Sequence, residues 1–222
     1  MTAAAHARPA DAGGLAAERR QRRSLVLASA SSARLQTLRR AGVSPVVIVS
    51  GVDESTHAAL APADQALALA QAKARAVAAL PETFDALVVG CDSMLDLDGH
   101  AFGKPADSAE AVTRWRSMRG RTGELVTGHC LIDNRRGTWR DGVARTTVHF
   151  ADISDDEVVA YVGTGEPLGV AGAFTLDGLG GAFVTGIEGD PHNVVGISLP
   201  LLRTMLADLG VAWIDLWTDL SG

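Results

Sequence analysis

Cysteine and aromatic residues are scarce in this sequence. Of its 222 residues only 5% are aromatic, and the two cysteines, Cys91 and Cys130, form no CxxC pair and no disulfide-rich spacing. This cysteine usage fits a reducing compartment. Long apolar runs are also lacking, since no segment approaches the roughly 18 apolar residues of a membrane span. We therefore predict a cytoplasmic protein with no membrane partner.

Clustered positive charge is a further absence. The 20 Lys and Arg residues are scattered among 26 Asp and Glu residues, and the formal net charge is -6 at pH 7. Binding to duplex DNA or to an anionic membrane surface needs clustered basic residues, so neither is expected as a main partner. An anionic ligand would have to be held by a local site.

The rest of the composition is typical of a folded globular domain. With 47% hydrophobic and 21% charged residues, the chain is long enough for one large core or two closely joined lobes. Residues 1–23 are rich in Ala and Arg but lack the apolar run of about 7 to 15 residues that a signal peptide needs. We predict that residues 1–23 form a disordered extension without a catalytic role, and that residues 24–222 form one domain.

Strand and helix patterns alternate over the first half of the chain. Apolar runs predict buried strands, and apolar residues at helical spacing predict helices. A hairpin that turns at Asp98 and Gly99 follows the third strand. The expected strands cover residues 24–30, 45–51 and 86–92, and the expected helices cover residues 32–42, 62–80 and 107–120.

Two long strands within residues 123–150, joined by a turn near residues 134–137, interrupt this alternation. The later patterns predict a helix over 154–165, a strand over 181–189, a helix over 193–210 that Pro200 enters near its first turn or kinks, and a short strand over 212–216. The sequence therefore predicts an α/β fold with a mixed β-sheet.

Acidic residues follow two of the expected strands. Asp53 and Glu54 come after the second strand, and Asp92 comes at the carboxyl end of the third. Ligands in open α/β sheets bind outside the carboxyl ends of strands. A lone aspartate in such a place more often only begins a turn, but Lys104 closes the same hairpin. Together, the two carboxylate clusters and the lysine indicate a metal and phosphate site.

The chemistry of such a site follows from its charges. Mg²⁺ binds carboxylate oxygens and substrate phosphates together, while Lys and Arg neutralise the remaining phosphate charge. An aspartate with its ordinary pKa of about 3.9 is a weak base at neutral pH. A basic role for Asp92 therefore requires burial or a metal-activated water beside it.

A row of small hydroxyl residues precedes the first expected helix, in the sequence LASASSARLQTL. Helix N-termini bind anions through their free amides and their dipole. Ser29, Ser31 and Ser32 can add hydroxyl donors, and Arg34 adds a positive charge one turn inside the helix. This arrangement predicts an anion site where the first strand gives way to the helix.

Five separated motifs resemble those of the Maf proteins, a family of nucleoside triphosphate pyrophosphatases that is also linked to septum formation. In order they read LASASSARLQTL, VDES, QAKA, VVGCDSMLDLDGHAFGKP and GEPLGVAGAFTLDGLGGAFVTGIEGDPHNVVGISLPLL, over roughly residues 25–210. The resemblance implies a mixed sheet with flanking helices and two lobes around a central cleft, similar to the inosine triphosphate pyrophosphatases. It also implies a homodimer.

The resemblance further implies a reaction. The family hydrolyses the bond between the α and β phosphates of ordinary or modified nucleoside triphosphates, and gives a nucleoside monophosphate and pyrophosphate with a divalent metal cation, Mg or Mn. The resemblance matches Asp92 to the family's aspartate that accepts a proton, and Arg34 to an arginine tied to substrate choice. The implied metal ligands are Glu54 and Asp92. The implied substrate-binding residues are Ser29, Ser31, Arg34, Lys73, Ser93, Lys104 and Asp177.

The motifs depart from the family pattern at several positions. Cys91 and Ser93 replace a usual alanine and threonine, and Ser32 and Ala33 stand where a proline and a first arginine are common. The anion site therefore has one positive charge fewer than in many relatives. Asp177 stands where the pyrimidine-specific branch has a glutamine, and an ionised carboxylate accepts hydrogen bonds but cannot donate them.

Some residues also have simpler interpretations. Lys73 lies on an Ala-rich helix and could be a solvated surface residue, and Lys104 could be a turn residue. Cys91 has no visible partner base and is expected to be a small buried residue rather than a nucleophile. Glu166 and Asn193 are expected to support the structure around the cleft rather than to act chemically.

Two functions from different classes remain. The first is a house-cleaning pyrophosphatase, in which Asp92 activates water at the α phosphorus and the basic residues of the cleft stabilise the developing charge. The second is a nucleotide-binding regulator of cell division with little turnover, and the departures from the family pattern are its main support. The resemblance favours the enzyme, and release of pyrophosphate separates the two.

Overall fold

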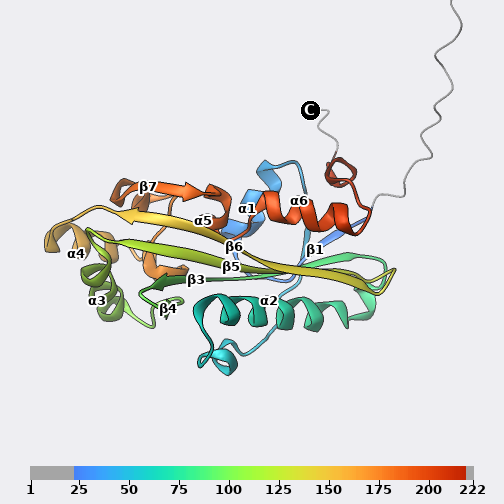
Figure 1. Cartoon of the computed structure of the whole chain (residues 1–222), viewed down its shortest axis with the longest axis horizontal. Helices are drawn as coiled ribbons and strands as arrows, with labels where there is room; N and C mark the ends of the chain where they lie inside the picture. Colours follow the sequence, from blue (N-terminus) through green and yellow to red (C-terminus); the bar gives the residue numbers. More distant parts are fainter. Residues whose placement is uncertain (1–22, 219–222) are drawn as a thin grey trace, which may run out of the picture.

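One seven-stranded mixed sheet organises the computed structural model, which describes residues 23–218 (Figure 1). The predicted extension of residues 1–23 lies, apart from its last residue, outside the described residues. That last residue, Arg23, places its guanidinium 2.5 Å and 2.6 Å from the two carboxylate oxygens of Asp133, a fully buried side chain.

The sheet combines parallel and antiparallel pairing. Its strand order is β2-β1-β3-β5-β6-β7, and β4 pairs with β3 outside this path. Pairing is parallel among β2, β1 and β3 and antiparallel elsewhere, so the predicted mixed sheet is confirmed. The strands are β1 Leu25–Leu27, β2 Val46–Val47, β3 Leu87–Leu97, β4 His100–Phe102, β5 Thr122–Asp133, β6 Thr138–Phe150 and β7 Val184–Gly189.

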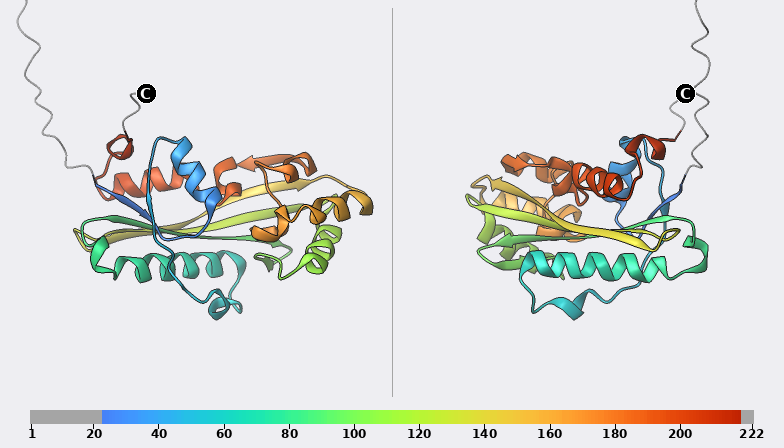
Figure 2. Two further views of the ribbon diagram at one scale, coloured as in Figure 1. Left: turned by 180° about the vertical axis from the view of Figure 1, so that it is seen from behind. Right: turned by 45° about the vertical axis from the view of Figure 1, so that its right-hand side comes forward.

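Helices cover both faces of this sheet. Helix α2 lies along one face, and α1, α5 and α6 lie on the other, as the three views agree (Figures 1 and 2). Helices α3 and α4 pack together at one end of the sheet (Figure 1). The helices are α1 Ser32–Arg40, α2 Pro62–Ala78, α3 Ser108–Met118, α4 Asp155–Gly163, α5 Pro191–Val195 and α6 Leu199–Asp208.

Local signals set most of these boundaries. The side chains of Ser31, Asp107 and Ser154 accept hydrogen bonds from the first-turn amides of α1, α3 and α4, which satisfies donors that helix N-termini leave free. The predicted hairpin turn is also confirmed. Asp98 and Gly99 both have positive φ, 55° and 81°, as a two-residue turn between twisted strands requires.

Two glycines let α2 lie unusually close to the sheet. A Cβ atom on Gly90 of β3 would stand 2.3 Å from the Ala70 carbonyl oxygen, and a Cβ on Gly128 of β5 would stand 2.3 Å from the Ala66 carbonyl oxygen. Glycines in the strands therefore face alanines in the helix, and the two backbones approach each other more closely than larger side chains would allow.

The hydrophobic core has two main parts, which correspond to two lobes. The first joins β1, β3 and β5 to α1 and α6, and the second joins β3, β5 and β6 to α3 and α4. Trp115 of α3 centres the second part, with its ring edge-on to those of Phe150, Tyr161 and Phe183. Strand β3 passes through both lobes, since Leu87 belongs to the first core and Leu95 to the second.

The predicted helix over residues 193–210 is wrong as one element. The chain forms α5, then breaks at Gly196, which has φ 115°, and begins α6 after the cap residue Ser198. A continuous run of apolar residues hides this break in the sequence, because the left-handed glycine and the capping serine lie inside the run. Pro200 occupies the first turn of α6, where it needs no amide partner.

Two predicted strands near the C-terminus also need correction. Residues 179–183 form a 3₁₀ helix, so the strand expected over 181–189 begins only at Val184. Residues 213–216 form another 3₁₀ helix rather than a strand, and only Trp217 bridges to Val43. Periodicity cannot separate a strand from a tight turn in an apolar segment this short.

None of the helices in residues 23–218 is long and apolar enough to cross a membrane.

The contact of α2 with β3 gives a first prediction. Gly90→Ala would force a methyl group against the Ala70 carbonyl oxygen, 2.3 Å away, so we expect the free energy of unfolding to fall by about 1–3 kcal/mol or more. Urea unfolding measures this change. Gly163→Ala is the control, since a Cβ there meets no atom within 4 Å; equal stability of both variants and the wild type would contradict the close packing.

Candidate active site

A cleft of about 370 Å³ opens between the two lobes. The loop from β1 into α1, the middle of β3, and the segments around residues 103, 170 and 195 form its walls. The structure brings to this cleft all but one of the residues that the sequence singled out for chemistry. These are Ser29, Ser31, Ser32, Arg34, Glu54, Lys73, Asp92, Ser93, Lys104 and Asp177. The exception is Asp53, whose carboxylate accepts the Ser55 amide at 2.9 Å and caps a 3₁₀ helix.

Asp92 lies in the middle of β3, so its predicted place at a strand end is wrong. The strand continues to Leu97 because it pairs with β5 along this whole length. Its parallel partner β1, however, pairs with β3 only as far as Val89, which lies opposite Leu27. Between Val89 and Leu95, where β4 begins to pair, this edge of β3 has no strand of the described chain beside it, and Asp92 therefore borders the cleft at the point where β3 passes from one lobe to the other.

Lys73 connects the two carboxylates of the cleft. Its Nζ atom lies 2.5 Å from Oδ1 of Asp92 and 2.5 Å from Oε1 of Glu54. The Lys73 side chain is 8% exposed and that of Asp92 is 7% exposed, whereas Glu54 is 53% exposed. Lys73 is therefore not the solvated surface lysine that its Ala-rich helix also allowed.

The two carboxyl groups differ in their acidity. Burial raises the pKa of Asp92 above its ordinary value, and the nearby charges of Lys73 and Arg34 offset only part of this effect. For Glu54 the smaller burial also favours the neutral acid, but the hydrogen bond and charge of Lys73 prevail and lower its pKa. Paired groups whose environments separate their pKa values are typical of acid–base sites, and here Asp92 is the stronger base.

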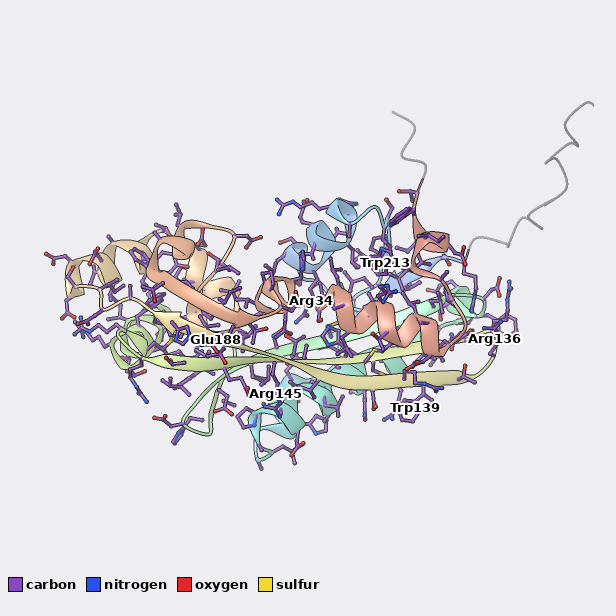
Figure 3. All side chains as sticks on the ribbon, turned by 45° about the horizontal axis from the view of Figure 1, so that its top comes forward. Arg34, Arg136, Trp139, Arg145, Glu188 and Trp213 are labelled. Carbon is purple, nitrogen blue, oxygen red and sulfur yellow. The ribbon has the colours of Figure 1, made fainter. Side chains whose placement is uncertain are left out.

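Arg34 lies above the middle of the sheet (Figure 3), where three hydrogen bonds hold its guanidinium. Its Nε donates to the Gly196 carbonyl at 2.7 Å, and its two terminal nitrogens donate to Oγ of Ser29 and Oγ of Ser93, both at 3.0 Å. The residue is only 8% exposed, yet it lines the cleft. A guanidinium has five N–H donors, so two are left for an anionic ligand.

The serines at the start of α1 act as acceptors within the protein. Ser31 caps the helix by accepting the Arg34 amide at 3.3 Å, and Ser29 accepts the Ser31 amide at 3.2 Å. Their hydroxyl hydrogens stay available for a ligand in the cleft. With the first-turn amides of α1, they place on the cleft wall the kinds of donor that the sequence predicted for an anion site.

Lys104 and Asp177 lie at the exposed rim of the cleft. Lys104 is close enough to Glu54 for its charge to help lower the Glu54 pKa. Asp177 lies 4.0 Å from Arg40 at the end of α1. Arg114, which the sequence did not single out, donates to the backbone oxygens of Gly103 and Lys104 at 2.5 Å and 3.4 Å and so holds this part of the rim in place.

The carboxylates of the cleft could hold a divalent cation only together with a bound molecule whose phosphates supply further oxygen ligands. Within residues 23–218 no three His, Cys, Asp or Glu side chains come together as a metal site. Lys73 uses one oxygen of Glu54 and one of Asp92, which leaves Oε2 and Oδ2 as donors. Mg²⁺ is commonly held by one or two carboxylates while phosphates and water supply its other ligands. The residues fit a metal of this kind.

Cys91, Asn193 and Glu166, which the sequence analysis expects to be structural, all make contacts that support the fold. Cys91 is fully buried in the first core, and burial raises the pKa of its thiol to about 12, which rules out a thiolate nucleophile at neutral pH. Asn193 is buried and donates to the Leu125 carbonyl at 3.0 Å. Glu166 accepts from Thr175 at 2.5 Å and from the amides of Leu179 and Gly180, both at 3.0 Å, and so shapes the adjacent wall of the cleft.

His129 is a buried residue that the sequence reasoning missed. Its side chain is fully enclosed, its Nε2 accepts the Ser198 amide at 2.8 Å, and its Nδ1 lies 3.0 Å from the Thr127 carbonyl oxygen. An amide can only donate, so Nε2 carries no proton and the neutral ring donates from Nδ1. Burial lowers the pKa of His129 to about 4. No motif marks such a residue, because both of its partners are backbone atoms.

Comparison with known proteins gives a consistent set of relatives. A family model described as Maf-like protein matches residues 24–209. A protein of Streptomyces coelicolor is 60% identical over 196 residues, which cover 88% of this chain and 95% of the relative. A protein of Streptomyces avermitilis is 58% identical, and the match covers 89% of this chain and 96% of the relative. A protein of Salinispora tropica is also 58% identical, and that match covers 87% of each chain. All three bear the name nucleoside triphosphate pyrophosphatase.

The buried His129 predicts a pH-dependent stability. Its pKa is about 4 in the folded protein against an ordinary 6.5, so the unfolded chain binds the proton more tightly. The free energy of unfolding should therefore fall as the pH drops from about 7 to about 4, with a contribution from this group on the order of 3 kcal/mol.

Urea unfolding of the wild type and of His129→Gln over this pH range tests the contribution. The glutamine keeps a hydrogen-bond acceptor but does not titrate, so the variant should lose less stability on acidification. The same pH dependence in both proteins would show that His129 does not titrate between folded and unfolded states.

Proposed function

The chain belongs to the family of Maf-like proteins, and from this premise we propose that it is a nucleoside triphosphate pyrophosphatase whose chemistry takes place in the cleft between the lobes. The observation that carries the proposal is the contact of the buried Lys73 with the buried Asp92 and the exposed Glu54, next to Arg34. It combines a base with fixed positive charges, as hydrolysis of a phosphoanhydride requires.

We propose that the triphosphate lies over the start of α1. Arg34, the hydroxyls of Ser29 and Ser31 and the first amides of α1 would bind phosphate oxygens there, with Lys104 at the rim. The wall of residues 169–177 has no basic side chain. It suits the nucleoside better than the phosphates, and Asp177 at its end can only accept hydrogen bonds from a base.

We propose Asp92 as the general base. A water molecule beside it attacks the α phosphorus, and its proton passes to the Asp92 carboxylate. The bond from the α phosphorus to the bridging oxygen breaks, and pyrophosphate leaves with the electron pair. Lys73 contacts Asp92, and Arg34 lines the same cleft, so both can stabilise the charge that develops on the phosphate oxygens.

Glu54 and Asp92 would hold the divalent cation, Mg or Mn, through their second carboxylate oxygens. When bound, the cation supplies positive charge that neutralises the phosphates.

A cytoplasmic location and a homodimer stay predictions from the sequence. A regulator with little turnover is the alternative, and nucleotide binding without pyrophosphate release would favour it.

Removal of the base tests the proposal. Asp92→Asn keeps the shape of the side chain but cannot take a proton, so we expect kcat to fall by about 100-fold or more. Pyrophosphate release from a panel of nucleoside triphosphates, with Mg²⁺ or Mn²⁺, measures the effect. Asp156→Asn, an exposed position on α4 outside the cleft, is the matched control and should keep full activity. Full activity of Asp92→Asn would remove Asp92 from the mechanism.

A further inference from the structure

The break between α5 and α6 supplies a backbone acceptor to the cleft. Helix α5 ends at Val195, and the carbonyl of its cap residue, Gly196, accepts the Nε–H of Arg34 at 2.7 Å. The last carbonyls of a helix have no partner within the helix. Here the free carbonyl points to the guanidinium, so the break that the sequence did not reveal has a direct consequence for Arg34.

Glycine is required at this break for two reasons. Residue 196 has φ 115°, a conformation that other residues rarely adopt. In addition, a Cβ atom there would stand 3.2 Å from Nε of Arg34 and 3.5 Å from Oγ of Ser93. A side chain at this position would therefore crowd the same guanidinium that the carbonyl orients.

His129 ties this segment to the sheet. Its Nε2 accepts the amide of Ser198, two residues after Gly196, and its Nδ1 donates to the Thr127 carbonyl of its own strand, β5. The Ser198 side chain in turn caps α6 by accepting the Leu201 amide. The imidazole thus fixes both the start of α6 and, through residues 196–198, the position of the Gly196 carbonyl.

We propose that His129 and Gly196 are positioning residues that hold Arg34 in the orientation for binding the triphosphate. This inference rests on the proposed function, since it assumes that Arg34 contacts phosphate. Three acceptors from three separate parts of the chain fix the guanidinium: Gly196, Ser29 and Ser93. Without the Gly196 carbonyl in place, the guanidinium can rotate and its remaining N–H groups no longer point to one phosphate position.

A double-mutant cycle with Arg34 tests this inference. We expect Arg34→Ala to lower kcat/KM by about tenfold to a few hundredfold, as the loss of a charged hydrogen bond does. His129→Phe keeps an aromatic ring but removes the acceptor, and we expect a loss of about three- to tenfold. In the Arg34→Ala background His129→Phe should change kcat/KM by less than about twofold, because its effect is transmitted through Arg34.

Three further variants separate positioning from general damage. His129→Gln retains an acceptor and should restore most of the activity. Cys130→Ala removes volume from the neighbouring buried residue on the opposite face of β5, and should lower stability without lowering kcat/KM. Arg39→Ala, an exposed arginine on the same helix as Arg34, should have no effect. If His129→Phe does not fold, Gly196→Ala replaces it in the cycle.

The outcomes distinguish this inference from the proposed function. Full additivity of the His129 and Arg34 effects, or a loss in Cys130→Ala equal to that in His129→Phe, would overturn the positioning role and leave the pyrophosphatase intact. The same cycle, run on the dissociation constant for inorganic tripolyphosphate by calorimetry, tests positioning without turnover. A wild type that releases no pyrophosphate but shows the cycle in binding would overturn only the enzymatic function. A wild type that neither releases pyrophosphate nor binds tripolyphosphate would overturn both.

Discussion

The ion pairs of Lys73 with Asp92 and Glu54 are the interaction on which the cleft depends. A buried ammonium and a buried carboxylate are each costly alone, and removal of one partner leaves the other charge uncompensated. Lys73 reaches Asp92 only because α2 lies close to the sheet. The helix can lie this close because Gly90 and Gly128 have no side chains, so its backbone packs directly against the backbone of the strands. The glycines in the strands and the alanines in the helix thus determine the distance between Lys73 and Asp92, the groups that we propose to act in the reaction.

The second constraint is the position of Arg34, which depends on elements far apart in the sequence. The loop before α1, the middle of β3 and the junction of α5 with α6 each contribute one acceptor. Ser93 also lies 2.9 Å from Thr127 on the neighbouring strand, so the polar side chains beneath the guanidinium form a connected network. A planar cation held on three sides has little freedom to follow a ligand, which favours one phosphate geometry over others.

The sequence predicted most of the charged groups that the fold brings to the cleft, but not how the fold holds them. Asp92, Lys73 and Arg34 are visible in the sequence because their chemistry is carried by side chains in recognisable motifs. The position of Asp92 within a strand was missed, since the sequence does not reveal that β3 continues to pair with β5 after β1 has ended. His129 and Gly196 act on backbone atoms, and Gly196 lies in an apolar run typical of a helix, so neither has a local signature.

The position of bond cleavage tests the central claim most directly. Hydrolysis of a nucleoside triphosphate in water labelled with heavy oxygen, followed by mass spectrometry of the products, shows which phosphorus the water attacks. The account predicts pyrophosphate without label and a nucleoside monophosphate that carries one labelled oxygen. Label in the pyrophosphate, or release of orthophosphate and a nucleoside diphosphate, would contradict attack at the α phosphorus beside Asp92.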